Sequence, residues 1–295
     1  MSSKVYEVIN NRIMEILEQG TIPWRKPWNA ESNMPKNLIS HKEYRGINHF
    51  LLACMPYESP YWLTFKQVQD KGGNVRKGEK SVPVIFWKWI GGNDLDNMEN
   101  SDTGKKVPIL KYYNVFNLDQ TEGISMPEPK EAHNDHHTLV EPERIVKDMP
   151  LKPDIRFGGN QACYSPEHDF IQLPHLHTFE SPEEYYSTMF HEIIHATGHT
   201  RRLGRRSLQE TSYFGSHEYS KEELVAEMGA AFICGLSGIE QRTIENSAAY
   251  IQGWLRELKN DKTLLIQAAA QAQKAADYIL NRKGGEEEII EDQAA

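Results

Sequence analysis

The chain of 295 residues lacks the features that would place it outside the cell or in a membrane. Its three cysteines, Cys54, Cys163 and Cys234, are odd in number and far apart, so they predict neither a disulfide framework nor clustered zinc ligands. No apolar run approaches the length of a membrane span, and no apolar signal segment follows Met1. These absences favour a globular cytoplasmic protein with no membrane partner.

Lys and Arg are outnumbered by Asp and Glu in the chain as a whole, but they are in excess in its first third. The formal net charge is −9, yet residues 1–92 carry 13 Lys/Arg against 8 Asp/Glu, a balance of +5. Residues 93–150 and 151–295 balance at −6 and −8. The basic first third indicates an anionic partner, although ordinary charge scatter would also give so modest an excess.

The most informative motif is His191-Glu192-Ile193-Ile194-His195, which has the form H-E-x-x-H in a segment with helical periodicity. Residues four apart lie on the same face of a helix, so His191 and His195 can point at one metal ion. Glu192, one position further on, can reach a water on that ion. This arrangement is typical of zinc peptidases, and the alternative is a surface helix with two solvated histidines.

A catalytic zinc ion normally has three protein ligands, so a third must come from another segment. Glu223 and Glu227 lie one turn apart on the next predicted helix, which Ser220 is expected to open as a capping residue. We expect Glu223 to be the ligand and Glu227 to accept a hydrogen bond from a ligand histidine. The alternative is that Glu223 closes the capping box with Ser220 and that Glu227 is the ligand.

With this site the expected chemistry is peptide hydrolysis. Zinc lowers the pKa of its bound water to about 7, and Glu192 would take the proton and return it to the leaving amine. The donor that stabilises the oxyanion could be Tyr213, His217 or Tyr219, and the sequence does not choose among them. Four arginines between residues 201 and 206 are interpreted as part of a solvated turn, and the alternative is that they contact an anion.

Aromatic and basic residues alternate in the first third of the chain. The segment between Pro23 and Trp28 contains Trp24, Arg25, Lys26 and Trp28. Its tryptophans would either stack on exposed bases while its cations meet phosphates, or pack onto the first helix. A second, glycine-rich segment carries Arg76, Lys77 and Lys80 before an aromatic strand. It reads as a single-strand nucleic-acid surface or as an ordinary hairpin with lysines.

The periodicity predicts an α+β protein with two domains. A helix at 5–17 should end at Gly20, and Thr64 should cap another helix. Strands are expected at 82–89 and 107–116, on either side of a polar insert. The predicted parts are an N-terminal α+β domain at 1–125, a linker with solvated histidines at 126–150, a mainly helical domain with a small edge sheet at 151–285, and an acidic tail at 286–295.

Together these segments resemble the ArdC-type antirestriction proteins, which join a single-stranded-DNA-binding domain to a zincin-like metallopeptidase domain. The matching motifs lie at residues 23–28, 44–48, 62–67, 72–80, 191–199, 202–203 and 219–227. The resemblance implies a Zn²⁺ site at His191, His195 and Glu223 with Glu192 as the base. It also implies a mobile-element protein that binds single-stranded DNA and shields incoming DNA from restriction. It adds four residues to the expected DNA surface, namely Tyr44, Arg45, Asn48 and Lys66.

Three functions remain open at this point. The first is a zinc metallopeptidase localised by DNA, acting on a protein substrate or a restriction-related partner. The second is a DNA-protecting protein whose metal site is structural or inactive, and the third is a DNA-processing hydrolase that uses the same metal. The complete H-E-x-x-H motif favours the first, because a purely structural site has no need of Glu192.

Overall fold

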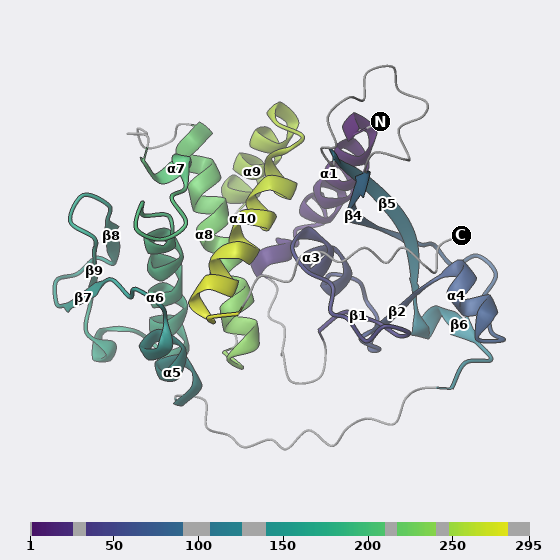
Figure 1. The fold of residues 1–295 in the computed structure, drawn as a ribbon, viewed down its shortest axis with the longest axis horizontal. Helices are drawn as coiled ribbons and strands as arrows, with labels where there is room; N and C mark the ends of the chain where they lie inside the picture. Colours follow the sequence, from purple (N-terminus) through teal and green to yellow (C-terminus); the bar gives the residue numbers. More distant parts are fainter. Residues whose placement is uncertain are drawn as a thin grey trace.

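The computed structural model describes six segments of the chain, at residues 2–25, 34–90, 107–125, 140–209, 217–239 and 248–282 (Figure 1). Several expected features lie outside these segments and stay predictions. They are the polar insert at 91–106, the linker histidines, Lys26, Trp28, Tyr213 and the acidic tail.

A four-stranded mixed sheet is the centre of the first half of the chain. The elements of this half are α1 (Ser2–Glu18), η1 (Pro23–Arg25), β1 (Lys36–Asn37), α3 (Ile47–Ala53), β2 (Tyr61–Thr64), α4 (Phe65–Asp70), β3 (Asn74–Val75), β4 (Val82–Ile90), β5 (Val107–Asn117), η2 (Leu118–Gln120) and β6 (Thr121–Glu122). The strand order is β1-β2-β5-β4, and β3 pairs separately with β6. Strands β4 and β5 form a long antiparallel hairpin, which their β-branched and aromatic residues favour.

Helices dominate the second half, with a small sheet at its edge. Its elements are α5 (Val140–Asp148), β7 (Asp154–Phe157), β8 (Cys163–Ser165), β9 (Phe170–Leu173), η3 (Leu176–Thr178), α6 (Pro182–Thr197), α7 (Arg206–Gln209), α8 (His217–Leu236), α9 (Ala248–Asn260) and α10 (Leu264–Ile279). In the sheet, β9 lies between a parallel β7 and an antiparallel β8. Among the described residues, no helix is long and apolar enough to cross a bilayer.

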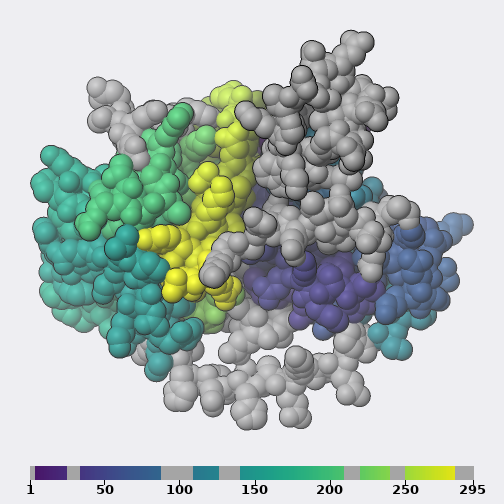
Figure 2. Space-filling model, viewed as in Figure 1, coloured from purple at the N-terminus to yellow at the C-terminus, as the bar shows by residue number. Residues whose placement is uncertain are grey.

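One hydrophobic core joins the two halves. Ile9 and Ile13 of α1 and Phe50 of α3 belong to the same buried cluster as Phe232 of α8 and Leu265 of α10. The rings of Phe50 and Phe232 stack with their centroids 4.7 Å apart. In Figure 2 the yellow surface of α10 lies between the teal and green atoms of the second half and the purple atoms of the first. An apolar contact of this kind resists the relative motion that polar domain interfaces allow.

The local signals for several helix ends are confirmed. Helix α1 ends just before Gly20, which has a positive φ of 84°. Thr64 caps α4 in a capping box with Gln67. The expected linker at 126–150 differs, because its last part forms α5, and Ile145 and Met149 are buried in the shared core. The domain boundaries themselves stay a prediction.

Candidate metal centre

Helix α6 carries the H-E-x-x-H motif, and the sequence fixes its start. Ser181 caps the helix by accepting a hydrogen bond from the backbone N–H of Glu184 at 3.2 Å, and Pro182 fills the first helical position. Phe190 and Ile194 are fully buried and anchor one face of the helix in the core. The helix can therefore hold its two histidines on another face, at fixed positions along its axis.

Helix α8 packs closely against α6 because Gly229 leaves room for Ile194. A Cβ atom added at Gly229 would lie 2.6 Å from Cδ1 of Ile194, well inside van der Waals contact. The close packing brings the first turns of α8 opposite the histidines of α6.

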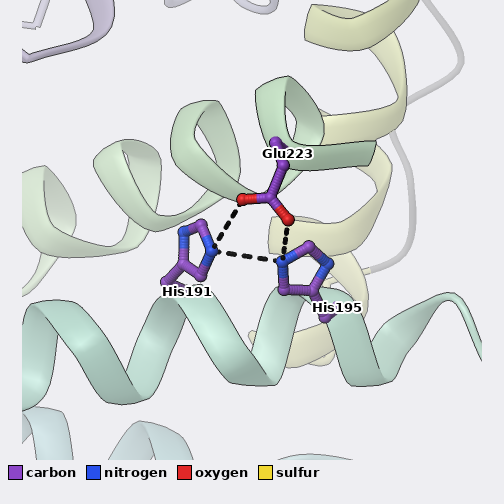
Figure 3. A group of neighbouring side chains, drawn as sticks. All are labelled: His191, His195 and Glu223. Atoms are coloured by element: carbon purple, nitrogen blue, oxygen red, sulfur yellow. Dashed lines mark hydrogen bonds and ion pairs between the residues drawn. The ribbon is translucent and has the colours of Figure 1, made fainter. Parts of the chain in front are cut away.

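The side chains of His191, His195 and Glu223 meet between the two helices (Figure 3). The Nε2 atoms of the two histidines are 3.1 Å apart, and each lies 3.5 Å from an oxygen of Glu223. A tetrahedral site with metal–ligand distances of about 2.0–2.2 Å separates its donor atoms by about 3.3–3.6 Å. The two distances to Glu223 lie in this range and the distance between the histidines is slightly shorter, so a small shift of the histidine rings lets the three side chains hold a single divalent ion.

The carboxylates around His195 control its charge in the protein without metal. Burial alone would lower the pKa of His195, but hydrogen bonds to Glu222 and Glu223 outweigh it and raise the pKa to about 10. Burial would raise the pKa of Glu223, yet hydrogen bonds from His191 and His195 hold it far below its usual range. A divalent cation at this point would replace the proton that now links these groups.

Glu192 follows His191 on α6, and the residue is 8% exposed. It therefore sits on the same helical turn as the first histidine, in surroundings largely shielded from water. The side chains of His191 and Glu223 are 26% and 27% exposed, so the centre between α6 and α8 is open on one side. The role of Glu192 as a base stays a prediction.

Glu222 and Arg205 are part of the site, although the sequence reasoning missed both. Glu222 faces Nδ1 of His195 at 3.3 Å, and Arg205 donates to Glu222. Each residue is only 5% exposed, so the interpretation of Arg205 as part of a solvated turn is wrong. Glu222 directly precedes Glu223 in the sequence, and this second carboxylate is the signal that could have revealed it. Neighbouring residues on a helix can contact the two ring nitrogens of one histidine.

Glu227 does not accept a hydrogen bond from a ligand histidine, so that expectation is wrong. It accepts from Nε1 of Trp24 at 2.9 Å and from the hydroxyl of Tyr250 at 2.5 Å. Helix α8 also starts at His217 rather than at Ser220. Ser220 is therefore inside the helix, and Glu223 is not committed to a capping box.

The proposed oxyanion donors are not distinguished by the structure. Tyr213 lies outside the described residues, and only the backbone of His217 and Tyr219 is described. All three stay predictions.

Three residues of the expected DNA surface make contacts within the protein. Trp24 is fully buried and packs edge to face on Trp254, so it is not exposed for base stacking. Arg45 pairs with Asp277 of α10. The side chain of Asn48 bonds both the N–H and the carbonyl of Ile85 at 2.7 Å. These contacts join segments far apart in the sequence, which local patterns do not reveal.

Of the remaining residues expected to bind DNA, some contact other parts of the protein and others are exposed. Tyr44 is partly buried, and burial raises its pKa to about 12. Arg76 donates to the carbonyl of Asp119 and pairs with Glu79 at 3.4 Å. Exposed cations remain at Lys66, Lys77 and Lys80. Of Arg25 only the backbone is described.

An exposed aromatic residue that the sequence reasoning did not include lies beside Lys66. Phe65 is 51% exposed, next to Lys66 at the start of α4, and its ring lies 6.3 Å from that of Phe116. Figure 1 shows α4 and β6 at the opposite end of the molecule from α6. The metal centre is therefore well separated from the end of the molecule that carries α4 and the exposed lysines, which we call the basic end.

Two histidines one turn apart on a helix, facing a carboxylate from the next helix, define a zincin-like metallopeptidase domain. Here it follows an α+β half with its own sheet. Residues 141–271 match the family model described as zincin-like metallopeptidase, and residues 3–116 match the N-terminal domain of anti-restriction factor ArdC. The chain belongs to the ArdC family of antirestriction proteins.

Solved structures and curated relatives agree with this family. The metal-free crystal structure of the antirestriction protein ArdC from plasmid R388 is 37% identical, covers 94% of this chain and 98% of its own, and has a TM-score of 0.71. The Mn(II)-bound structure of the same protein is 36% identical, with coverages of 94% and 97% and a TM-score of 0.72.

Two curated proteins extend the comparison. The uncharacterised protein y4eC of Sinorhizobium fredii is 32% identical over 290 residues, which are 93% of this chain and 91% of that protein. A DNA primase TraC of Escherichia coli is 33% identical over 294 residues, 93% of this chain but 20% of the primase. The chain thus spans about a fifth of the length of that primase.

Proposed function

We propose that this protein is a DNA-binding antirestriction protein of a mobile element whose second half is a zinc-dependent metallopeptidase. The observation that carries the proposal is the meeting of His191, His195 and Glu223 at separations that suit one tetrahedral ion. Two imidazoles and one carboxylate are the donor set of many catalytic zinc sites, and this chemistry favours Zn²⁺. The partial exposure of His191 and Glu223 agrees with a catalytic site, because structural zinc sites are closed.

Glu192 would act as the general base. When bound, the zinc ion would polarise the substrate carbonyl and lower the pKa of a water to about 7. The Glu192 carboxylate takes the proton of that water and later delivers it to the leaving amine. Its low exposure of 8% limits competition from bulk water for this proton. Glu223 and the two histidines hold the ion, and they do not move protons.

Single-stranded DNA would bind at the end of the molecule that carries Lys66, Lys77 and Lys80. These exposed ammonium groups can meet phosphates, and the exposed ring of Phe65 offers a base a surface for stacking. Membership of the ArdC family and the primase named among the relatives support a partner of this kind. The cytoplasm is the compartment in which such DNA is found.

A second candidate is a DNA-protecting protein whose metal site is structural or inactive. The observation in its favour is the separation between α6 and the basic end of the first half, since DNA at α4 would not reach the metal centre (Figure 1). In this case protection from restriction would need only the first half. In the first case a protein substrate or a restriction-related partner would be cut.

A restriction-protection assay separates the two candidates. Wild-type protein and Glu192→Ala are compared for protection of incoming DNA from a restriction enzyme, after zinc analysis of both proteins. The peptidase proposal expects equal zinc in both and loss of protection in Glu192→Ala. Equal protection by the two proteins would favour the second candidate, and absence of zinc from the wild type would reject the metal site itself.

A further inference from the structure

A buried ion pair lies directly behind the metal centre, at the ring nitrogen of His195 that faces away from Glu223. His195 directs Nδ1 to Glu222 at 3.3 Å and Nε2 to Glu223 at 3.5 Å. Arg205 donates from Nε and Nη2 to the two oxygens of Glu222 at 3.2 and 2.6 Å. Glu222 also accepts from the hydroxyl of Ser207 at 2.6 Å, so both of its oxygens are engaged.

Arg205 also binds the end of α6, the helix that carries the histidines. Its Nη2 donates to the carbonyl of Ile194 at 2.7 Å and approaches that of His195 at 3.4 Å, and its Nη1 donates to the hydroxyl of Thr197 at 2.5 Å. Carbonyl groups in the last turn of a helix have no partner within the helix, so they are ready acceptors. One guanidinium therefore ties the end of α6 to Glu222 on α8.

The chain leaves space for this guanidinium at Gly198. A Cβ atom at Gly198 would lie 3.0 Å from both Cζ and Nη2 of Arg205 and 2.9 Å from Cδ2 of Leu208. The φ of Gly198 is −73°, which any residue can adopt. A Cβ atom at this position would therefore press on the ends of the Arg205 and Leu208 side chains, although the backbone conformation itself suits any residue.

We propose that the Arg205–Glu222 pair is a positioning device for His195. The Glu222 carboxylate keeps the proton on Nδ1, so that Nε2 offers its lone pair to the ion. The guanidinium fixes the spacing of α6 and α8, and hence the separation of His195 from Glu223. This inference rests on the proposed metal site, and it assigns to Glu222 the supporting role that the sequence alone suggested for Glu227.

Zinc dissociation constants, measured by competition with a chelator, test the proposal. Glu222→Gln keeps the shape of the side chain but removes the charge, and we expect zinc to bind tenfold to a hundredfold more weakly. Gly198→Ala leaves Glu222 and Arg205 in place but pushes on the guanidinium, and we expect a smaller loss in the same direction. Glu227→Gln is the matched control on the same helix, because Glu227 binds Trp24 and Tyr250 and not His195. The zinc affinity of this variant should stay within twofold of wild type.

Two further measurements separate positioning from simple stabilisation. The melting temperature of each protein without metal reports on folding, and the visible spectrum of the cobalt-loaded protein reports on ligand geometry. We expect a changed cobalt spectrum in Glu222→Gln at temperatures where the protein is folded. If Glu222→Gln misfolds, Gly198→Ala alone must show the weaker binding.

Three outcomes would overturn these ideas in distinguishable ways. Wild-type zinc affinity and cobalt spectrum in folded Glu222→Gln would reject the positioning role and leave the metal site standing. An equal loss of zinc affinity in Glu227→Gln and Glu222→Gln would also reject the positioning role, because any disturbance of α8 would then be enough to weaken zinc binding. Absence of a stoichiometric zinc site from the wild type, with no effect of His191→Ala, would reject the proposed function itself.

Discussion

The contact between α6 and α8 and the basic end around α4 use their charged side chains in opposite ways. At the metal centre, charged groups are packed against one another and largely withdrawn from water, as Glu222 and Arg205 show at 5% exposure. At the α4 end, Lys66 and Lys77 are exposed. The first arrangement depends on exact spacing, whereas the second can tolerate loss of a single member.

This difference follows from the energetics of charge in the two settings. Removing one partner of a buried, hydrogen-bonded set leaves the other without compensation, and the cost is several kcal/mol. Exposed cations act through a field that is shared and screened by salt, so each contributes little by itself. Changes at the metal centre and the core should therefore act strongly and singly, and changes at the α4 end weakly and additively.

The largest effect is expected for Trp24, which the sequence placed with the DNA-binding residues and the structure buries between the halves. Trp24→Ala should lower the free energy of unfolding by about 3–5 kcal/mol, because it leaves a cavity and removes a donor from Glu227. Urea unfolding measures the loss. Trp24→Phe, which keeps a ring against Trp254, should cost clearly less.

DNA affinity of Trp24→Ala, measured where the protein is folded, should be unchanged. A loss of DNA binding without a loss of stability would return Trp24 to the DNA surface.

Removal of the third ligand comes next. Glu223→Ala should weaken zinc binding more than a hundredfold, beyond the tenfold to hundredfold typical of groups that only support a ligand. Metal analysis after dialysis against a chelator measures this. Glu227→Ala is the comparison, and zinc that is retained in Glu223→Ala but lost in Glu227→Ala would exchange their roles.

The packing of the two helices predicts an intermediate effect. Gly229→Ala should destabilise the protein by about 1–3 kcal/mol, because its Cβ would lie 2.6 Å from Ile194. It should also weaken zinc binding, since α8 carries Glu223. Gly253→Ala is the control in α9, where a Cβ would have no neighbour within 4 Å, and it should stabilise by about 0.5–1 kcal/mol. Equal unfolding midpoints for the two variants would contradict the close approach of α6 and α8.

The smallest effects are expected at the exposed cations. Lys66→Ala, Lys77→Ala and Lys80→Ala should each weaken single-stranded DNA binding a few-fold and reduce the salt slope of the affinity by about 1. Binding measured over a salt series checks this. Lys262→Ala, which removes an exposed lysine paired with Glu7, should change neither quantity. An unchanged salt slope in all three variants would place the DNA elsewhere.

Local patterns predicted most of the secondary structure. The cap at Thr64 and the end of α1 near Gly20 depend on neighbouring residues alone, and both are confirmed. The start of α8 was misplaced, because a Ser-x-x-Glu pattern marks a helix start only when the residues before it are not helical. The helix in the expected linker was missed because Ile145 gains its burial from partners that are far away in the chain.

The sequence by itself determined that His191 and His195 share a helical face, because a spacing of four residues is a property of the α-helix. It also determined which residue types could hold a metal ion. Only the tertiary structure decided that Glu223 faces the histidines, that Glu222 and Arg205 lie behind them, and that Glu227 serves Trp24 instead. The physical reason is that helix α8 can present neighbouring glutamates to different partners, and the packing of α8 between α6 and η1 alone selects which partner each one meets.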